Sequence, residues 1–580
     1  MKYTGLFFVR NRRALQGLID APYHILGRHA LCAQNTATDG GAIACAVGRL
    51  RNGDTLREQI KDAGLTLNEP HNLSELTLQA YRLWGHDYPR HLSGPIATAL
   101  IDQDAQALVL SRDPMGELPM FYTYKAGSIA FSDHPAALLD SGIASRVVDQ
   151  DGLCELFGLG PARTPGLTPF RDIRSLEPGT SLIADSHTHR LVRFFELEAH
   201  EHEDSEIQTI QTVRNLVEQS VADIAPLHPA SMLSGGLDST VLTALLKKQT
   251  RKTIDTWSVD YEDSARYFSG NNFQIERDTP FIERAVELFG TNHHMVTLNA
   301  DQLAGGLMEA MRQRAMPGMG DIDSSLMLFA REIGKEHEYV VSGECGDEVF
   351  GGYPWFNREE MILSESFPWS GSIALRESVL KKGVREKLHL SRYVCTRYHE
   401  SACGLPRLVS DSLREARLRQ LHGLCFSWFM PNLQERAQRM CSASNLTVLT
   451  PFSDERLVQY LYNVPWEMKS MRGSEKGLLR VAMQDLLPDD LLWRKKSPYP
   501  KTHHPAYAQL MREQMSAILR DPSSPILDLI DVNAVQALID SPLKPADTPW
   551  FGQLMAGAQM LAYLIQVNGW LLEYRVEVDI

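Results

Sequence analysis

The chain has 580 residues, of which 43% are hydrophobic and 22% are charged. These proportions are those of globular proteins, so they exclude a largely disordered, collagen-like or coiled-coil chain, and the length predicts more than one domain. Lys and Arg number 58 against 72 Asp and Glu, a net charge of -14, and no basic run is present. Nucleic acid is therefore not an expected partner.

Targeting and membrane segments are not predicted. Residues 1–17 hold only a few consecutive apolar residues before an arginine cluster, which is too short for the core of a signal peptide. The apolar tract 554–567 is interrupted by glutamines and is shorter than the ~20 residues that cross a bilayer. Eight cysteines without a CxxC pair predict neither a disulfide framework nor a zinc site. We therefore expect a cytoplasmic protein without a membrane span.

Residues 1–205 form the first predicted domain. Short apolar stretches separated by turn residues, such as 94–114 and 118–133, are typical of strands and hairpins. Acidic and polar residues without apolar periodicity gather at 196–209, and we place the domain boundary there.

Residues 206–580 form the second predicted domain. Apolar residues recur at three- and four-residue spacing in 208–224, 281–290 and 324–336, whereas 253–261 is strand-like. Strands that alternate with helices predict an α/β fold with a doubly wound parallel sheet.

The segment 229–248 (PASMLSGGLDSTVLTALLKK) predicts a strand, a glycine-rich turn and a helix. Backbone N–H groups of such a turn and the positive end of the helix make an anion site, to which Ser234 and Ser239 add hydroxyl donors. The loop lacks the lysine of a Walker A motif and carries Asp238 instead. Because this carboxylate would repel a phosphate unless a cation lay between them, we infer Mg²⁺. An ordinary strand–turn–helix without a ligand is the alternative.

A second motif, 342–353 (SGECGDEVFGGY), follows the predicted strand 338–341. Glu344, Asp347 and Glu348 lie there among glycines at a strand end, the edge where open α/β sheets bind ligands. Clustered carboxylates at that edge would hold Mg²⁺ or act as a base. A solvated acidic turn is the alternative.

At these two motifs the sequence resembles the asparagine synthetase family, whose synthetase domain carries SGGxDS and SGExxDE. Other stretches are similar to the family in the same order along the chain: 111–124, 129–139, 155–180, 293–298, 449–465 and 475–505. The resemblance implies an α/β fold with two parts. An N-terminal Ntn-hydrolase-like (glutaminase-type) αββα domain precedes a C-terminal doubly wound parallel-sheet ATP-pyrophosphatase domain.

The resemblance implies an enzyme that uses ATP and Mg²⁺ to adenylate a carboxylate, and then lets an amine displace AMP. Mg²⁺ and a cation would absorb the charge that develops on pyrophosphate and on the acyl oxygen. It implies Glu344 as the acid/base carboxylate and Lys496 as the lysine that stabilises the acyl transition state, with Asp347 as a further catalytic residue. The residues implied for ATP are Ser234, Gly235, Gly236, Asp238, Ser239, Val259, Ser342 and Gly343, with Mg²⁺ on Asp238 and Asp347. The neighbouring Lys495 leaves the register of the lysine open by one residue, and a solvated lysine pair is the alternative.

The sequence departs from the family in the first domain. Glutamine hydrolysis in this family needs a cysteine as the new N-terminus once Met1 is removed, but the second residue is Lys2 and the first cysteine is Cys32. Lysine cannot supply a thiolate nucleophile. The family's Asn-Gly-Glu glutamine-binding loop is also absent, with 48–59 in its place. We therefore expect a degenerate glutamine amidotransferase-like domain that persists as a scaffold.

A member without its own ammonia source needs another amine. In two branches of the family, the β-lactam synthetases and the lasso-peptide macrocyclases, an amine of the same substrate attacks the adenylate. The strings 342–356 and 496–505 are more similar to bacterial asparagine synthetases and lasso cyclases than to β-lactam synthetases. We therefore predict a lasso peptide cyclase that adenylates an Asp or Glu side chain of a leader-cleaved core peptide and closes an isopeptide macrolactam with the peptide α-amine. The alternatives are an asparagine synthetase that uses free ammonia, a β-lactam synthetase-like amide ligase, and a non-enzymatic scaffold.

The resemblance to lasso cyclases also implies partners, namely the core peptide, a leader peptidase and a leader-binding protein of the same pathway. Asp323, Ser324 and Tyr353 are weaker candidates for substrate contact. Asp323 and Ser324 fit a helix N-cap before 326–333 better, and a cap needs no ligand.

Overall fold

The computed structural model describes residues 3–7, 24–26, 29–33, 36–125, 127–185, 187–268, 270, 276–543 and 549–580. The chain divides into two compact units. The first comprises 1–152, 163–196 and 576–580, and the second comprises 153–162 and 197–575. Within the described ranges, no helix combines the length and the apolar character needed to cross a membrane.

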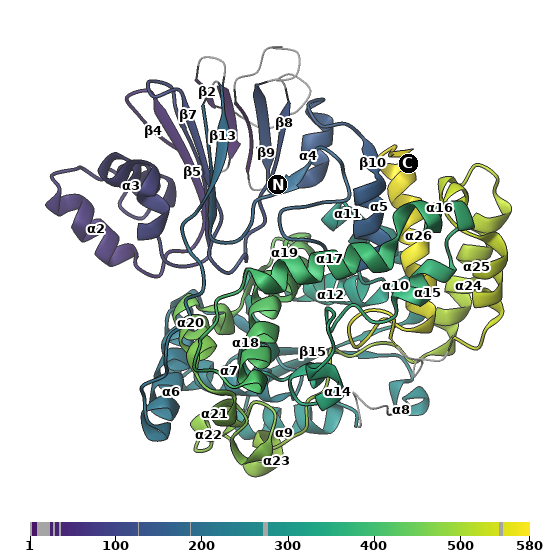
Figure 1. Cartoon of the computed structure of the whole chain (residues 1–580). Coiled ribbons are helices and arrows are strands. Elements are labelled where there is room, and N and C mark those ends of the chain that lie inside the picture. The colour runs from purple at the N-terminus through teal and green to yellow at the C-terminus, as the bar shows by residue number, and fades with distance from the viewer. Residues whose placement is uncertain are drawn as a thin grey trace. The chain divides into compact units, whose positions relative to one another are not determined.

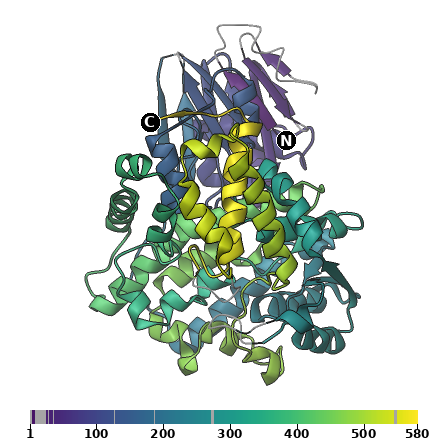
Figure 2. The same ribbon diagram turned by 90° about the vertical axis from the view of Figure 1, so that its right-hand side faces the viewer.

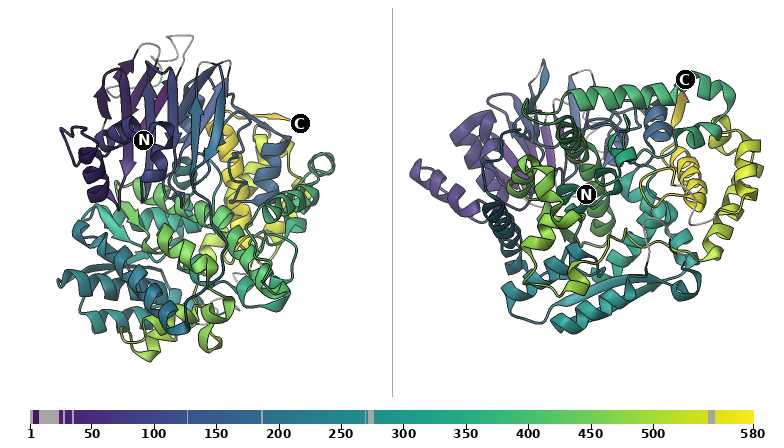
Figure 3. Two further views of the ribbon diagram at one scale, coloured as in Figure 1. Left: turned by 60° about the vertical axis from the view of Figure 1, so that its left-hand side comes forward. Right: turned by 60° about the horizontal axis from the view of Figure 1, so that its bottom comes forward.

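The first unit contains two six-stranded antiparallel sheets (Figure 3). In spatial order, the strands of one sheet are β11 (Arg174–Ser175), β8 (Phe121–Lys125), β9 (Ser128–Ser132), β1 (Tyr3–Phe7), β3 (His29–Ala33) and β2 (His24–Leu26). Those of the other are β13 (His189–Arg193), β12 (Thr180–Ala184), β7 (Ala107–Ser111), β6 (Ile96–Asp102), β5 (Ala42–Gly48) and β4 (Thr36–Asp39). A short parallel pair joins β10 (Val147–Asp149) to β19 (Glu577–Asp579).

Apolar side chains pack between the two sheets and also on their outer faces. Ile101, Leu110 and Phe131 belong to the core between the sheets. On the outer face of the second sheet lie α2 (Gly53–Asp62) and α3 (Leu73–Trp84), whose apolar residues form a second core with strands of that sheet (Figure 1). The helix α4 (Pro135–Asp140) packs against β8 and β9. The layers therefore follow the order helix, sheet, sheet, helix, which confirms the expected αββα domain.

The second unit is built on a five-stranded sheet in which every pair is parallel. Its strands, in spatial order, are β16 (Asn292–Leu298), β15 (Asp255–Tyr261), β14 (Ala230–Met232), β17 (Tyr339–Val341) and β18 (Thr447–Leu449). The chain starts at the central strand β14, proceeds to one edge, and then returns to β17 on the other side. This order confirms the doubly wound sheet and creates a switch point between β14 and β17.

Helices cover both faces of this sheet. Buried residues of α11 (Leu307–Arg314), α12 (Asp321–Ile333) and α19 (Met430–Ser442) share one core with β14, β17 and β18. Towards α9 (Thr279–Phe289), Leu233 at the end of β14 packs with Ala285 in a smaller core. The helix expected at 281–290 is α9, and the one expected at 324–336 is α12, which begins three residues earlier.

The remaining helices of the second unit surround this framework, and α24, α25 and α26 lie side by side (Figure 2). The longer ones are α6 (Glu206–Ala222), α7 (Leu237–Thr250), α17 (Leu390–Cys403), α18 (Leu413–Leu424), α20 (Glu455–Asn463), α24 (Pro505–Arg520), α25 (Val532–Asp540) and α26 (Gly557–Glu573). The shorter ones include α10 (Ala300–Gly305), α13 (Gly346–Phe350), α16 (Lys382–Leu388), α21 (Trp466–Lys469), α22 (Gly477–Ala482) and α23 (Asp489–Leu492).

One short segment belongs to a different unit from its neighbours in sequence. Residues 153–162 belong to the second unit although residues on both sides belong to the first. The carbonyl of Gly158 accepts a hydrogen bond from the buried Arg376 guanidinium, and the Tyr563 hydroxyl donates to the carbonyl of Leu156 at 2.8 Å. The sequence shows no signal for this crossing because these contacts come from residues far along the chain.

Candidate active site

The two glycine-containing motifs meet at the switch point of the parallel sheet. The first motif, Ser234–Ser239, spans the turn after β14 and the start of α7. The second, Ser342–Asp347, spans the turn after the adjacent strand β17 and the start of α13. A cavity of about 250 Å³ opens there. Of the residues implied for ATP, Mg²⁺ and catalysis, those that line it are Ser234, Gly236, Asp238, Ser239, Val259, Ser342, Gly343, Glu344, Asp347 and Lys496.

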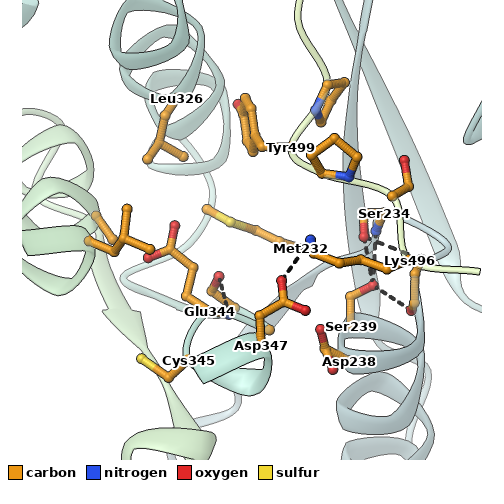
Figure 4. Close-up of a pocket in the computed structure, with 18 of the residues that line it drawn as sticks. Met232, Ser234, Asp238, Ser239, Leu326, Glu344, Cys345, Asp347, Lys496 and Tyr499 are labelled. Carbon is orange, nitrogen blue, oxygen red and sulfur yellow. Dashed lines mark hydrogen bonds and ion pairs between the residues drawn. The ribbon is translucent and has the colours of Figure 1, made fainter. Parts of the chain in front are cut away.

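The first loop has the geometry of an anion site. Gly235 has φ +68°, and a Cβ atom there would lie 2.8 Å from the backbone nitrogen of Ile282, so only glycine fits this turn. Ser234 and Ser239 form a hydroxyl pair 3.0 Å apart (Figure 4). Gly236 is the N-cap of α7, which places the helix N-terminus at the cavity wall. Backbone N–H groups and the helix dipole there favour a phosphate.

The second loop packs tightly against the first. A Cβ atom at Gly343 would lie 2.9 Å from the backbone nitrogen of Ser239, and one at Gly346 would lie 2.7 Å from the Asp238 carboxyl carbon. Cys345 between them adopts the left-handed conformation, with φ +73°. The glycines of both motifs therefore allow the two backbones to approach, and this approach brings Asp238 beside Asp347.

Two lysines pair with these carboxylates. The Lys476 ammonium contacts Asp238 and lies 2.5 Å from Oδ1 of Asp347. The Lys496 ammonium lies 2.8 Å from Oδ2 of Asp347 (Figure 4). Lys476 is the more deeply buried of the two lysines, with 3% of its side chain exposed.

These contacts set the charge of the cluster. Burial raises the pKa of Asp347, but the neighbouring Lys476 and Lys496 outweigh it and bring that pKa to about 2. Burial lowers the pKa of Lys476, yet Asp238 and Asp347 outweigh burial and raise it above its ordinary value. The cluster therefore keeps an ionised carboxylate and a charged ammonium at neutral pH, as a site for a phosphate and a cation requires.

The two carboxylates fit a magnesium ion that is shared with a nucleotide. In the described part of the chain, no group of three or more His, Cys, Asp or Glu is placed to hold a metal alone. Oδ1 of Asp238 is buried and accepts no hydrogen bond from a described residue. Mg²⁺ is usually held by one or two carboxylates together with substrate phosphates. Asp238 and Asp347 are the residues that would hold it here.

The structure distinguishes the two adjacent lysines. Lys496 lines the cavity and contacts Asp347, whereas Lys495 is exposed and does not line the cavity. Of the two lysines that the resemblance leaves open, Lys496 is therefore the one whose side chain reaches the cavity.

Glu344 points to a different part of the cavity from Asp347 (Figure 4). Asp347 faces Lys496, whereas Glu344 extends towards the side of Leu326 and Tyr499. Burial raises the pKa of Glu344, and the nearby Arg436 guanidinium opposes this effect. A buried carboxylate away from the phosphate loop is suited to proton transfer at the acyl centre.

The weaker substrate candidates are separated by the structure. Tyr353 lines the cavity and donates a hydrogen bond of 2.7 Å to Oε1 of Glu348. Asp323 and Ser324 are fully buried and do not line it. The helix-cap interpretation is wrong in position, because α12 begins at Asp321 and its N-cap is Gly320. Gly235 does not line the cavity either, and its role is to allow the tight turn.

Three further basic residues line the cavity, and the sequence predicts a role for none of them. Lys476 belongs to a stretch that is similar to the family, and it adopts the left-handed conformation with φ 54°. Arg494 contacts Asp278 and donates to the carbonyl of Ser234 at 3.3 Å. Arg436 reaches the cavity from α19. Single basic residues on helices and loops carry no signal by themselves, because only the fold brings them to the two motifs.

Two sequence observations concern the first unit. Lys2, which stands where the family's nucleophilic cysteine would be, lies outside the described residues. The segment that replaces the Asn-Gly-Glu loop begins at Gly48, which has φ +112° and ends β5. It continues through Asn52, which donates to the carbonyl of His91 at 2.8 Å, into α2. Residues 49–59 therefore form a bend and a surface helix.

Comparison with known proteins gives concordant matches along most of the chain. The profile of the family described as Asparagine synthase matches residues 212–572, and that of the Glutamine amidotransferase domain matches residues 24–195. Asparagine synthetase (glutamine-hydrolyzing) 3 of Bacillus subtilis is 38% identical over 538 residues, which cover 92% of this chain and 87% of the relative. Asparagine synthetase (glutamine-hydrolyzing) 1 of the same organism is 23% identical over 492 residues, covering 78% of this chain and 74% of the relative. The Saccharomyces cerevisiae protein of that name is 22% identical over 561 residues, covering 89% and 81%.

Proposed function

Since this chain belongs to the asparagine synthase family, we propose that it forms amides through an acyl-adenylate, with an amine that its own N-terminal domain does not release from glutamine. The family makes the chain an ATP-dependent, amide-forming ligase. The observation that carries the proposal is the cavity in which Asp238, Asp347 and Lys496 adjoin the phosphate loop while Glu344 faces away from it.

The residues divide between two half-reactions. In the first, a carboxylate oxygen of the substrate attacks the α-phosphorus of ATP, an acyl-phosphate bond forms, and pyrophosphate leaves. Ser234, Ser239 and the N-terminus of α7 bind the departing pyrophosphate, and Lys476 and Lys496 stabilise its charge. When bound, Mg²⁺ on Asp238 and Asp347 supplies further neutralisation of the phosphates.

In the second half-reaction, an amine attacks the acyl carbon and AMP leaves. The nitrogen gives up a proton as the C–N bond forms, and Glu344 accepts it as general base. Lys496 stabilises the oxygen that becomes negative in the tetrahedral intermediate. Water must stay out of the cavity during this step, because hydrolysis would waste the adenylate.

Our proposal for the source of the amine depends on the sequence of the first unit. The position immediately before β1 is Lys2 instead of cysteine, and the Asn-Gly-Glu loop is replaced by 48–59. The relatives are named as glutamine-hydrolyzing enzymes. We propose that this chain differs from them in not hydrolysing glutamine. We propose that the first unit is a scaffold and that nitrogen arrives as free ammonia or as an amine of the substrate.

The first candidate is synthesis of asparagine from aspartate and free ammonia. The names of the relatives support it, and a 38% identical relative spans nearly the whole chain. It requires only that ammonia enter the cavity from solvent.

The second candidate is a lasso peptide cyclase that joins an Asp or Glu side chain to the α-amine of the same peptide. One observation favours it over a free amino acid. Every basic residue that lines the cavity, within the described part of the chain, already has an acidic partner; these residues are Arg436, Lys476, Arg480, Arg494 and Lys496. Free aspartate brings an α-carboxylate that needs a cation, whereas the acceptor residue of a peptide brings none.

The second candidate also implies partners. A cyclase of leader-cleaved peptides needs a core peptide as substrate, and a leader peptidase and a leader-binding protein that prepare it. We propose these partners only together with the peptide substrate.

The experiment that separates the candidates measures AMP release and product together. The chain is incubated with Mg-ATP, aspartate and ammonium, and separately with Mg-ATP and a synthetic peptide that has a free α-amine and an Asp or Glu several residues along. Asparagine with equimolar AMP supports the first candidate. Loss of one water from the peptide with equimolar AMP supports the second, and ADP in place of AMP in both incubations refutes the adenylate.

A further inference from the structure

A row of buried charges runs from the interior of the second unit to Glu344. The Arg436 Nη1 atom lies 3.5 Å from Oε1 of Glu344, and its Nε donates to Oδ1 of Asp323 at 2.6 Å. The other oxygen of Asp323 lies 3.6 Å from Nη1 of Arg314. Only 4% of the Arg436 side chain and 1% of that of Asp323 are exposed. Burial of such charges lowers the stability of the fold unless each charge is paired.

We propose that Arg436 is the positioning residue for the Glu344 carboxylate, holding it in the orientation in which it takes the proton from the attacking amine. This inference rests on the proposed function and assigns a residue to its second half-reaction. Under this proposal different basic residues serve the two half-reactions. Arg436 acts in the amide-forming step, and Lys476 and Lys496 act in adenylation.

Arg436 is itself held in one orientation from several sides. Its Nη2 donates to the carbonyl of Ile322 at 3.0 Å, and its guanidinium lies over the ring of Tyr499, 5.5 Å from the ring centre. Asp323 is anchored in turn, because its Oδ2 accepts from the backbone N–H of Met319 at 2.8 Å. A guanidinium fixed by three partners presents its remaining N–H groups in a defined direction, which an isolated lysine ammonium would not do.

One carboxylate oxygen of Glu344 remains available to accept a proton. Its Oε1 faces Arg436, whereas Oε2 is buried and accepts no hydrogen bond from a described residue. The titratable and charged groups that face it are Arg436 and Cys441 from α19, Asp323 from α12, Glu348 from α13, and Tyr499. Arg436 is the cation among them, so its removal leaves the carboxylate among acids and neutral groups. The carboxylate would then be less often ionised and free to rotate.

The test compares AMP release with amide formation in Arg436→Gln. With the acceptor that gives product in the wild-type chain, aspartate and ammonium or the peptide, the variant is expected to keep AMP release within about threefold and to lose amide formation about 100-fold, as a misplaced catalytic group does. The excess AMP then comes from hydrolysis of the adenylate. The KM for the amine is expected to stay unchanged while kcat falls.

Two further variants keep the test decisive. Arg436→Lys retains the charge without the fork of N–H groups and is expected to recover part of the amide yield per AMP. Arg419→Gln is the matched control, because Arg419 forms an equally buried pair with Asp411, both 5% exposed, and does not line the cavity. The control is expected to lower stability and leave the amide yield per AMP unchanged.

Two kinetic outcomes would overturn the inference. One is an amide yield per AMP in Arg436→Gln equal to that of the wild type. The other is a parallel loss of AMP release and amide formation in an Arg436→Gln variant that melts like the wild type.

If the wild-type chain releases no AMP with any acceptor, the proposed function has failed instead. The pairing of Arg436 with Glu344 is then tested by the melting temperatures of Arg436→Gln, Glu344→Gln and the double variant. Additive shifts would overturn the pairing.

Discussion

The ammonium of Lys496 lies 2.8 Å from Oδ2 of Asp347. One residue comes from the extended segment after α23 and the other from α13, so the contact joins two parts of the chain that are far apart in sequence. It holds the lysine beside the carboxylate that we propose as a Mg²⁺ ligand, where in the proposed reaction both the pyrophosphate and the acyl oxygen become negative. A substrate phosphate would compete for the same ammonium.

Substitution of Lys496 is expected to abolish activity, while the same change at its neighbour is not. Lys496→Ala should lower kcat for AMP release by about 100-fold or more, because a preorganised donor to the transition state is lost. Lys495→Ala is the matched control, since that side chain is exposed and does not line the cavity. Steady-state AMP release for both variants is the measurement. Equal losses in the two would contradict the assignment.

Removal of a proposed magnesium ligand is expected to change the metal requirement. Asp238→Asn keeps the size of the side chain but loses its charge, so the Mg²⁺ concentration for half-maximal AMP release should rise at least about tenfold. Asp301→Asn, in the first turn of α10, serves as a control away from the cavity. A magnesium titration at saturating ATP is the measurement. An unchanged requirement in Asp238→Asn would rule out this ligand.

A methyl group at Gly346 is expected to displace Asp238. Its Cβ atom would lie 2.7 Å from the Asp238 carboxyl carbon, so the carboxylate or the loop must move. Gly346→Ala should therefore lower kcat about 100-fold, as a displacement of about an ångström can. Gly383→Ala is the control, because nothing lies within 4 Å of a Cβ there and the residue belongs to α16. Wild-type activity in Gly346→Ala would show that the tight approach of the two loops is not required.

Lys469 is expected to make stability depend on pH. Burial lowers its pKa to about 7, and its ammonium nitrogen lies 3.1 Å from Nδ1 of His422. Between pH 7 and the ordinary lysine pKa of about 10.4, the unfolded chain binds more protons than the folded one, so stability rises with pH by up to about 1.4 kcal/mol per unit. Relative to Lys469→Met, the wild type should gain melting temperature from pH 7 to pH 9.5. A constant difference between the two would contradict the lowered pKa.

Much of the catalytic cavity was predictable from sequence, because its two loops are local. Each motif follows a strand and carries its own glycines and acids, which predict Mg²⁺ at Asp238 and either Mg²⁺ or a base at the acidic cluster after β17. The assignment of Asp347 to the same ion as Asp238 is what the family resemblance implies. The parallel sheet then brings both to the switch point. Physical rules for open α/β sheets sufficed for this step.

The rest depended on packing between distant segments. Which of Lys495 and Lys496 reaches the cavity depends on the side to which each side chain points. The sequence pattern of an extended segment does not encode this direction. The sequence predicts a helix cap at Asp323 because helix starts are uncertain by a few residues. The structure instead places Asp323 within the first turn of α12, three residues after the N-cap Gly320, where it accepts a hydrogen bond from Arg436. Lys476 reaches the cavity only through the fold, so no local signal identified it.

We propose that an adenylate forms in this cavity and that the first unit does not take the amine from glutamine. The most direct measurement is amide product and AMP from Mg-ATP and aspartate with either glutamine or ammonium, together with glutamate release from glutamine. With glutamine we expect neither glutamate nor asparagine. Asparagine formed with ammonium would support the first candidate, and product formed only when the peptide is supplied would support the second. Asparagine made from glutamine with equimolar glutamate would show that the first unit supplies the amine, against this proposal.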